Sequence, residues 1–111
     1  MSEEHASYNA ATLPQTLDAF KNRNCTRLYT DENYSPPTPE EVNQLIILCG
    51  WSQNDAAKLV GVKWDTKHGS STIRKWKSDK AKKDHREIPY SAWRLLLIYS
   101  GVVNTDNHTG S

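Results

Sequence analysis

Apolar residues recur at helical spacing in several stretches of this chain, and glycine, proline or polar runs separate the stretches. The clearest stretch follows Thr38, which can cap a helix, with Pro39 suited to the first turn and Glu41 placed to complete a capping box. Its apolar positions fall on one helical face: Val42, Leu45, Ile46 and Cys49. Gly50 suits the end of such a helix. The pattern predicts a helix over about residues 39–49.

The same signals predict three more helices towards the C-terminus. One is expected over about residues 53–60, between the capping residue Ser52 and the helix-ending Gly61. A short helix should follow over about residues 70–77, and a last one over about residues 89–100. The tryptophans on the apolar faces of these segments are expected in the core: Trp51, Trp76 and Trp93.

The first 37 residues are more polar and give weaker signals. Three apolar residues at helical spacing predict a short helix over about residues 13–23: Leu13, Leu17 and Phe20. The segment over residues 25–29 fits a short strand or an extended packing segment. Residues 1–12 are small and polar, and we expect them to be disordered. Residues 1–37 are therefore treated as an N-terminal extension, and residues 102–111 as a flexible tail.

A chain of 111 residues with 36% hydrophobic and 24% charged residues is expected to form one domain of ordinary composition. Its longest apolar run covers residues 95–98, far short of the roughly 20 residues that span a bilayer. The acidic start lacks the order of a secretory signal, which predicts a cytoplasmic protein. Cys25 and Cys49 are isolated, so we expect buried thiols and no disulfide or metal pair.

The net charge of +1 conceals a strong segregation of charge along the chain. Residues 1–57 carry three basic and eight acidic side chains, which gives −5, and residues 87–111 carry −1. Residues 58–86 carry ten basic and three acidic side chains, a net charge of +7. Such a concentration of positive charge indicates binding to a polyanion.

The stretch from Trp51 to Trp76 has the pattern of two helices around a glycine-containing turn. Ala56-Ala57 supplies the small residues that closely crossing helices need, and the second helix is basic and opened by hydroxyl residues. Over residues 38–101 the chain resembles the DNA-binding core of the Cro and phage-repressor (xenobiotic-response-element-like) helix-turn-helix family. It departs from that pattern in its long inserted loop, residues 63–69, and in its first 37 residues.

The resemblance implies an all-α, compact helix-turn-helix bundle of about four to five helices with an N-terminal extension. It further implies a transcriptional regulator of a phage or mobile element, a probable repressor in the bacterial cytoplasm or nucleoid, that binds double-stranded DNA as a homodimer. The sequence offers two candidate dimer surfaces. One is the N-terminal extension, and the other is the last helix through Trp93, Leu96, Leu97 and Tyr99.

In this family the second helix of the motif enters the major groove. The residues expected to face base edges are Ser70, Ser71, Thr72, Arg74 and Lys75. Arg74 is the best candidate because a guanidinium can hold guanine O6 and N7 with two hydrogen bonds. Helix capping is an equally good explanation for the hydroxyl residues, and a solvated helix face is the alternative for the two cations.

Further polar residues are candidates for phosphate contacts, which carry no sequence information. They are Gln53, Asn54, Lys63, Lys67, Lys77, Lys80, Lys82 and Lys83, with Arg86 beside them. The alternative for the lysine-rich stretch over residues 77–86 is a solvated linker. Trp64 in the inserted loop is expected to be a local core anchor, or else to pack on the DNA backbone.

The sequence contains no glycine-rich phosphate loop, no histidine and carboxylate set at metal spacing, and no nucleophile near a base. We therefore expect neither an enzyme nor a metal or cofactor site, and no small-molecule substrate. Two other functions remain open. The fold could be the scaffold of a protein-interaction adaptor that works through residues 1–37, or a DNA-binding subunit of a packaging or recombination machine.

Overall fold

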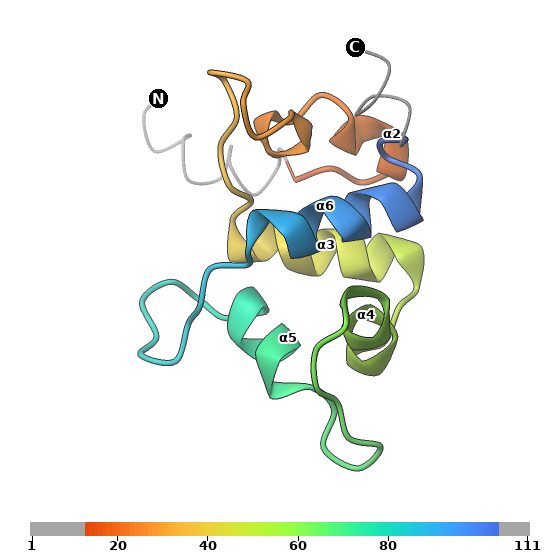
Figure 1. The fold of residues 1–111 in the computed structure, drawn as a ribbon, viewed down its shortest axis with the longest axis vertical. Helices are drawn as coiled ribbons and strands as arrows, with labels where there is room; N and C mark the ends of the chain where they lie inside the picture. Colours follow the sequence, from red (N-terminus) through yellow and green to blue (C-terminus); the bar gives the residue numbers. More distant parts are fainter. Residues whose placement is uncertain (1–12, 105–111) are drawn as a thin grey trace.

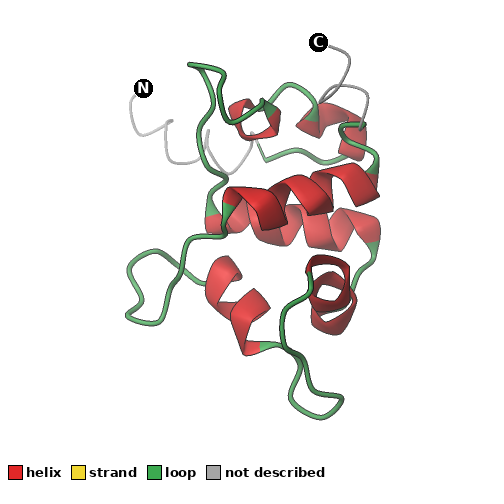
Figure 2. Cartoon of the chain, viewed as in Figure 1, coloured by secondary structure: helices red, strands yellow, loops and turns green. Residues whose placement is uncertain are grey.

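The computed structural model describes residues 13–104, and within this range the chain is helical without a β-strand (Figure 2). Its α-helices are α2 (Leu17–Phe20), α3 (Pro39–Cys49), α4 (Gln53–Val60), α5 (Ser71–Lys77) and α6 (Tyr90–Ser100). The all-α prediction is thus confirmed. No helix among these residues is long and apolar enough to cross a membrane. The disorder expected for residues 1–12, and most of the expected tail, lie outside the described residues.

Helix starts follow the capping signals in the sequence. At α3, the Thr38 hydroxyl accepts a hydrogen bond from the Glu41 amide at 3.1 Å, and the Glu41 carboxylate accepts one from the Thr38 amide at 2.8 Å. Ser52 and Asp55 form the same reciprocal box at α4. Gly61 ends α4 with a φ of +79°, a left-handed conformation that glycine adopts at little cost.

Helices α3 and α6 lie side by side, with α4 and α5 packed together on one side of them (Figure 1). Ala56 and Ala57 of α4, the small residues expected where the two helices of the motif cross, are fully buried. Trp76 and Trp93 are also buried, whereas Trp51 is only partly buried against the core. Both described cysteines are free, and burial raises the pKa of the Cys25 thiol, which keeps it protonated at neutral pH.

The first described residues pack onto the other face of α3 and α6, and their structure differs from the prediction. The helix predicted over residues 13–23 is reduced to α2, which is capped by Thr16. Instead of a strand or an extended segment, the chain then forms a 3-10 helix, η1 (Asn24–Thr26). The indole N–H of Trp93 donates to the Cys25 carbonyl at 2.9 Å, so the backbone at η1 is tied to the centre of α6.

Two buried charged residues, Arg94 of α6 and the capping residue Glu41 of α3, hold this layer in place. Arg94 is only 5% exposed, and its Nη1 donates to the Thr26 carbonyl at 2.7 Å and to the Arg27 carbonyl at 3.3 Å. The buried carboxylate of Glu41 accepts a hydrogen bond from Arg23 Nε at 2.8 Å. After α6, Val102 and Val103 are buried as well, so the first part of the predicted flexible tail belongs to the core.

Candidate nucleic-acid interface

Helix α5 presents a polar face that the rest of the protein leaves uncovered. Ile73 and Trp76 point into the core, at 0% and 5% exposure. Ser71 and Arg74 are exposed, while Thr72 and Lys75 are half-buried at the edges of the same helix. Four of the five residues predicted to face base edges therefore retain access to solvent.

Ser70 is the exception among the predicted base-contacting residues. It is only 1% exposed, and its hydroxyl accepts a hydrogen bond from the Ile73 amide at 3.3 Å. It is the N-cap of α5, which the sequence analysis gave as the alternative explanation. A capping side chain in this position cannot reach a base, because the protein itself covers it. Ser70 is therefore removed from the set of candidate DNA contacts.

Arg74 is held by α4 and by the inserted loop, the two segments that precede α5 in the chain. Its Nη1 donates to the carbonyl of His68 in the inserted loop at 2.6 Å and to Gln53 Oε1 at 3.2 Å. The same Gln53 oxygen accepts the Ser70 amide at 3.1 Å. The carboxamide oxygen of Gln53 thus bridges α4 to the start of α5, and the phosphate contact expected of Gln53 stays a prediction. Both of these hydrogen bonds of Arg74 use Nη1, so Nε and Nη2 are left for a partner.

Asn54 also has an internal role, and its phosphate contact stays a prediction. Its Nδ2 donates to the Asp65 carbonyl at 3.1 Å and so holds the inserted loop against α4. Lys63 and Lys67 in that loop are exposed, as a phosphate contact requires. Trp64 is 42% exposed, with Lys58 Nζ at 4.4 Å from its ring centroid, so the expectation of a core anchor there is wrong.

The basic connector, residues 78–86, follows α5 and is folded into turns that return to it. The Arg86 amide donates to the Lys75 carbonyl at 3.1 Å, and His85 Nδ1 lies 2.9 Å from the Ser78 carbonyl oxygen. A groove of about 390 Å³ lies between α5 and the connector. It brings four of the predicted DNA-contacting cations together: Arg74, Lys75, Lys77 and Lys82.

Lys77 lies less open to solvent than the connector lysines. Burial, and after it the charge of Arg74, lowers the pKa of Lys77. An anion placed in the groove would offset this repulsion between neighbouring cations. Lys80, Lys82 and Lys83 are exposed along the connector. The protein does not desolvate these side chains, so they are open to a polyanion.

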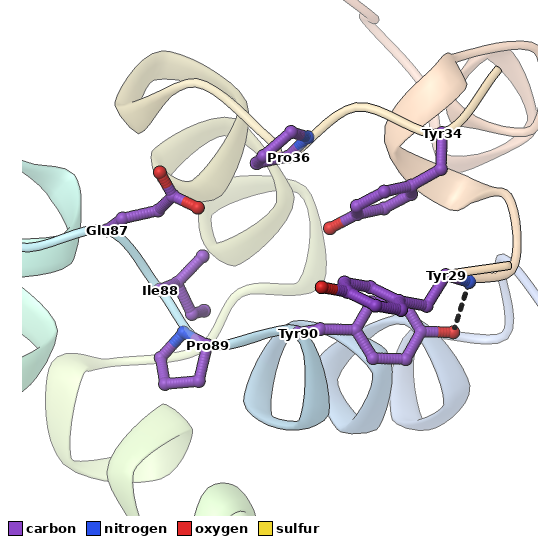
Figure 3. A pocket seen from close by; sticks show the side chains of 7 residues that line it. All are labelled: Tyr29, Tyr34, Pro36, Glu87, Ile88, Pro89 and Tyr90. Carbon is purple, nitrogen blue, oxygen red and sulfur yellow. Dashed lines mark hydrogen bonds between the residues drawn. The ribbon is translucent and has the colours of Figure 1, made fainter. Parts of the chain in front are cut away.

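A different cavity, of about 720 Å³, lies between the segment of residues 29–36 and the start of α6 (Figure 3). Tyr29, Tyr34 and Tyr90 pack with ring centroids 5.1 to 5.7 Å apart, and the Tyr90 hydroxyl accepts a hydrogen bond from the Tyr29 amide at 3.2 Å. Burial raises the pKa of Tyr34 to about 12. The three packed tyrosine rings fasten the N-terminal layer to α6. Glu87 is the charged residue that lines the cavity.

The candidate dimer surface on α6 needs correction. Trp93, Leu96 and Leu97 are all 0% exposed and belong to the core, so they cannot meet a second chain in this conformation. The apolar residues of α6 that do reach the surface are Leu95 and Tyr99, at 38% and 57% exposure. With Ser91 and Ile98 they form the exposed α6 face, hollowed by a cavity of about 420 Å³ that Leu95 and Ile98 line.

Among residues 13–104 no group of three or more histidine, cysteine, aspartate or glutamate side chains is placed to hold a metal ion. The structure brings cations of α5 and the basic connector together in one groove, and the inserted loop adds the exposed Lys63 and Lys67 before α5. These three elements are consecutive in the chain and project on the same side of α3 and α6 (Figure 1).

No protein-family model and no solved structure matches the sequence. Two curated proteins of Escherichia coli are similar to it, and each is named Transcriptional repressor protein KorC. The first is 35% identical over 71 residues, which cover 64% of this chain and 74% of the relative. The second is 28% identical over 71 residues with the same coverage. By this similarity the chain belongs to the family of the KorC transcriptional repressor proteins.

Proposed function

We propose that the chain is a transcriptional repressor that binds double-stranded DNA sequence-specifically through α5 in the major groove. The two relatives are named as transcriptional repressors, which supports the regulatory part of the proposal. The observation that carries the groove-binding part is the exposed face of α5, with Arg74 fixed by Gln53 and the inserted loop. A fixed guanidinium loses less conformational freedom when it binds a base.

Base contacts are assigned to Ser71, Thr72, Arg74 and Lys75. Phosphate contacts are assigned to the lysines around them, which neutralise the backbone on either side. They lie in the inserted loop, at the end of α5 and in the basic connector: Lys63, Lys67, Lys77, Lys80, Lys82 and Lys83. Such contacts give affinity that falls steeply with salt, whereas the α5 contacts give preference for one sequence.

A homodimer is part of the proposal because a helix of seven residues contacts few base pairs. The exposed α6 face is the proposed dimer surface. It carries Leu95 and Tyr99 one helical turn apart, and no residue of α6 lines the groove of cations. Pairing through it would let two α5 helices reach two half-sites on one duplex.

The direct experiment is selection of bound sequences from a random duplex pool with the full chain, followed by measurement of the affinity for the enriched sequence. The proposal predicts one enriched motif with twofold symmetry. Binding without enrichment would favour a packaging or recombination subunit that uses DNA nonspecifically. Absence of any duplex binding at low salt would favour a protein-interaction adaptor.

A further inference from the structure

We propose that the inserted loop, residues 63–69, is a preformed second DNA-contacting element that grips the phosphates beside the α5 site. Asp65 is the positioning residue that holds the loop in its binding shape. This inference rests on the proposed function, because its partner is the same duplex.

Asp65 closes the loop through its backbone and its side chain together. Its amide donates to the Gly69 carbonyl at 2.8 Å, and the Gly69 amide donates back to the Asp65 carbonyl at 2.8 Å. Asp65 Oδ1 accepts the Lys67 amide at 2.7 Å, and Oδ2 lies 3.2 Å from His68 Nδ1. These contacts fix the backbone from one side of the loop to the other.

The loop is fastened to both helices of the motif. Asn54 of α4 holds the Asp65 carbonyl, and Arg74 of α5 holds the His68 carbonyl. Gly69 has a φ of +77°, and a Cβ at this position would press against the Oε1 atom of Gln53. The loop therefore keeps a fixed position relative to α5, and a duplex that contacts α5 meets the loop in one geometry.

The fixed loop turns its cations outward. Lys63 and Lys67 are exposed, and Lys58 on α4 adds a third charge above the ring of Trp64. The loop extends from the start of α5 away from α3 and α6 (Figure 1). Asp65 is the acidic residue in the loop, and its carboxylate accepts internal hydrogen bonds.

The dimensions of DNA place this loop over the backbone. A helix of seven residues is roughly 10 Å long, and the major groove is about 12 Å wide. When α5 contacts base edges, the chain at its start therefore lies beside the phosphates that border the groove. The loop is the segment that occupies this position, so its lysines are aimed at the flanking backbone.

The role of Asp65 can be tested because two explanations predict opposite changes in DNA affinity for the same substitution. If only charge mattered, Asp65→Ala would remove a negative charge and tighten binding by about twofold. If Asp65 orders the loop, the same substitution weakens binding, by about fivefold, because the binding shape must then be formed on the DNA. Asp65→Asn keeps the oxygen that accepts the Lys67 amide, so it should bind at least as tightly as the wild type.

Asp84→Ala is the matched control, because Asp84 lies in the basic connector beside the same groove of cations. It should tighten binding by about twofold. Affinities are measured on the selected duplex and on one shortened to the base pairs under α5. The proposal predicts that Asp65→Ala weakens binding to the long duplex more than to the short one, because on the short one only the hold of the His68 carbonyl on Arg74 is lost.

Replacement of Lys63 and Lys67 together by alanine provides a second test that leaves Asp65 in place. On the long duplex, it should make the slope of log affinity against log salt concentration shallower by about two. Tighter binding by Asp65→Ala, or an unchanged salt slope in the double variant, would overturn the inference while the wild type still binds DNA. A wild type that binds no duplex would overturn the proposed function, and this inference with it.

Discussion

The carboxamide oxygen of Gln53, the first residue of α4, lies 3.2 Å from Nη1 of Arg74 in α5 and 3.1 Å from the amide nitrogen of Ser70. One side chain thus fixes both the start of the proposed recognition helix and the orientation of its arginine. The helices α4 and α5 therefore act as a unit in which the first positions the second.

Gln53→Ala should reduce sequence preference more than it reduces nonspecific affinity. Removal of the oxygen frees the Arg74 guanidinium to sample other rotamers, which must be reordered on binding. The measurement is the ratio of affinities for the selected and a scrambled duplex. Gln44→Ala is the control, because Gln44 lies on α3 and donates to the Pro14 carbonyl. A ratio equally lowered in both variants would contradict the role given to Gln53.

The exposed α6 face predicts that Leu95→Glu prevents dimerisation. A charge in an apolar contact loses its hydration without a partner, so association is weakened. Sedimentation at micromolar concentration should show a monomer, and affinity should fall on a duplex with two half-sites but not on a single half-site. Ile47→Glu is the control, since Ile47 is a 59% exposed apolar residue of α3. A wild type that is monomeric, alone and on DNA, would contradict this surface.

The hydrogen bond between Trp93 and the Cys25 carbonyl predicts that Trp93→Phe strongly lowers the free energy of unfolding. The substitution leaves a buried carbonyl without its donor, which costs about 1–3 kcal/mol beyond the lost apolar surface. Trp76→Phe is the comparison, because Trp76 is nearly as buried but its indole N–H makes no hydrogen bond within residues 13–104. Chemical denaturation of both variants measures the difference. Equal free energies of unfolding would show that the N-terminal layer gains nothing from this bond.

The capping box of α4 predicts that the stability of the fold depends on pH. The hydrogen bonds from the Ser52 amide and hydroxyl lower the pKa of Asp55 below its ordinary value of 3.8. A carboxyl with a depressed pKa stabilises the fold above its unfolded pKa, and this contribution is lost as the pH falls through the folded pKa. The stability difference between wild type and Asp55→Ala should therefore be constant near neutral pH and shrink below about pH 4. A difference that grows on acidification would contradict the box.

The sequence was most informative where local chemistry decides the structure. The caps at Thr38 and Ser52 and the glycines at 50 and 61 predict the bounds of α3 and α4 correctly, because these signals act within one turn. The short extent of α2 was not predicted. Spacing of Leu13, Leu17 and Phe20 indicates a shared face but does not say how much of the segment is helical.

Side-chain roles that depend on tertiary contacts were harder to predict. Leu96 and Leu97 suit an interface as well as a core, and only the packing of α6 against α3 and α4 decides between the two roles. No role was predicted for Arg94, which is buried and donates hydrogen bonds to carbonyls more than 60 positions earlier in the chain. The order of the inserted loop likewise depends on Asn54 and Arg74, which no local pattern connects.

Arg74→Lys tests whether α5 reads base edges through Arg74. Lysine keeps the charge but cannot form the two parallel hydrogen bonds to guanine, which are worth about 1–3 kcal/mol of discrimination. Affinities for the selected and the scrambled duplex are compared for wild type, Arg74→Lys and Lys82→Ala. The account predicts that Arg74→Lys lowers the ratio of the two affinities about tenfold, while Lys82→Ala weakens both duplexes alike. An unchanged ratio in Arg74→Lys would contradict the account.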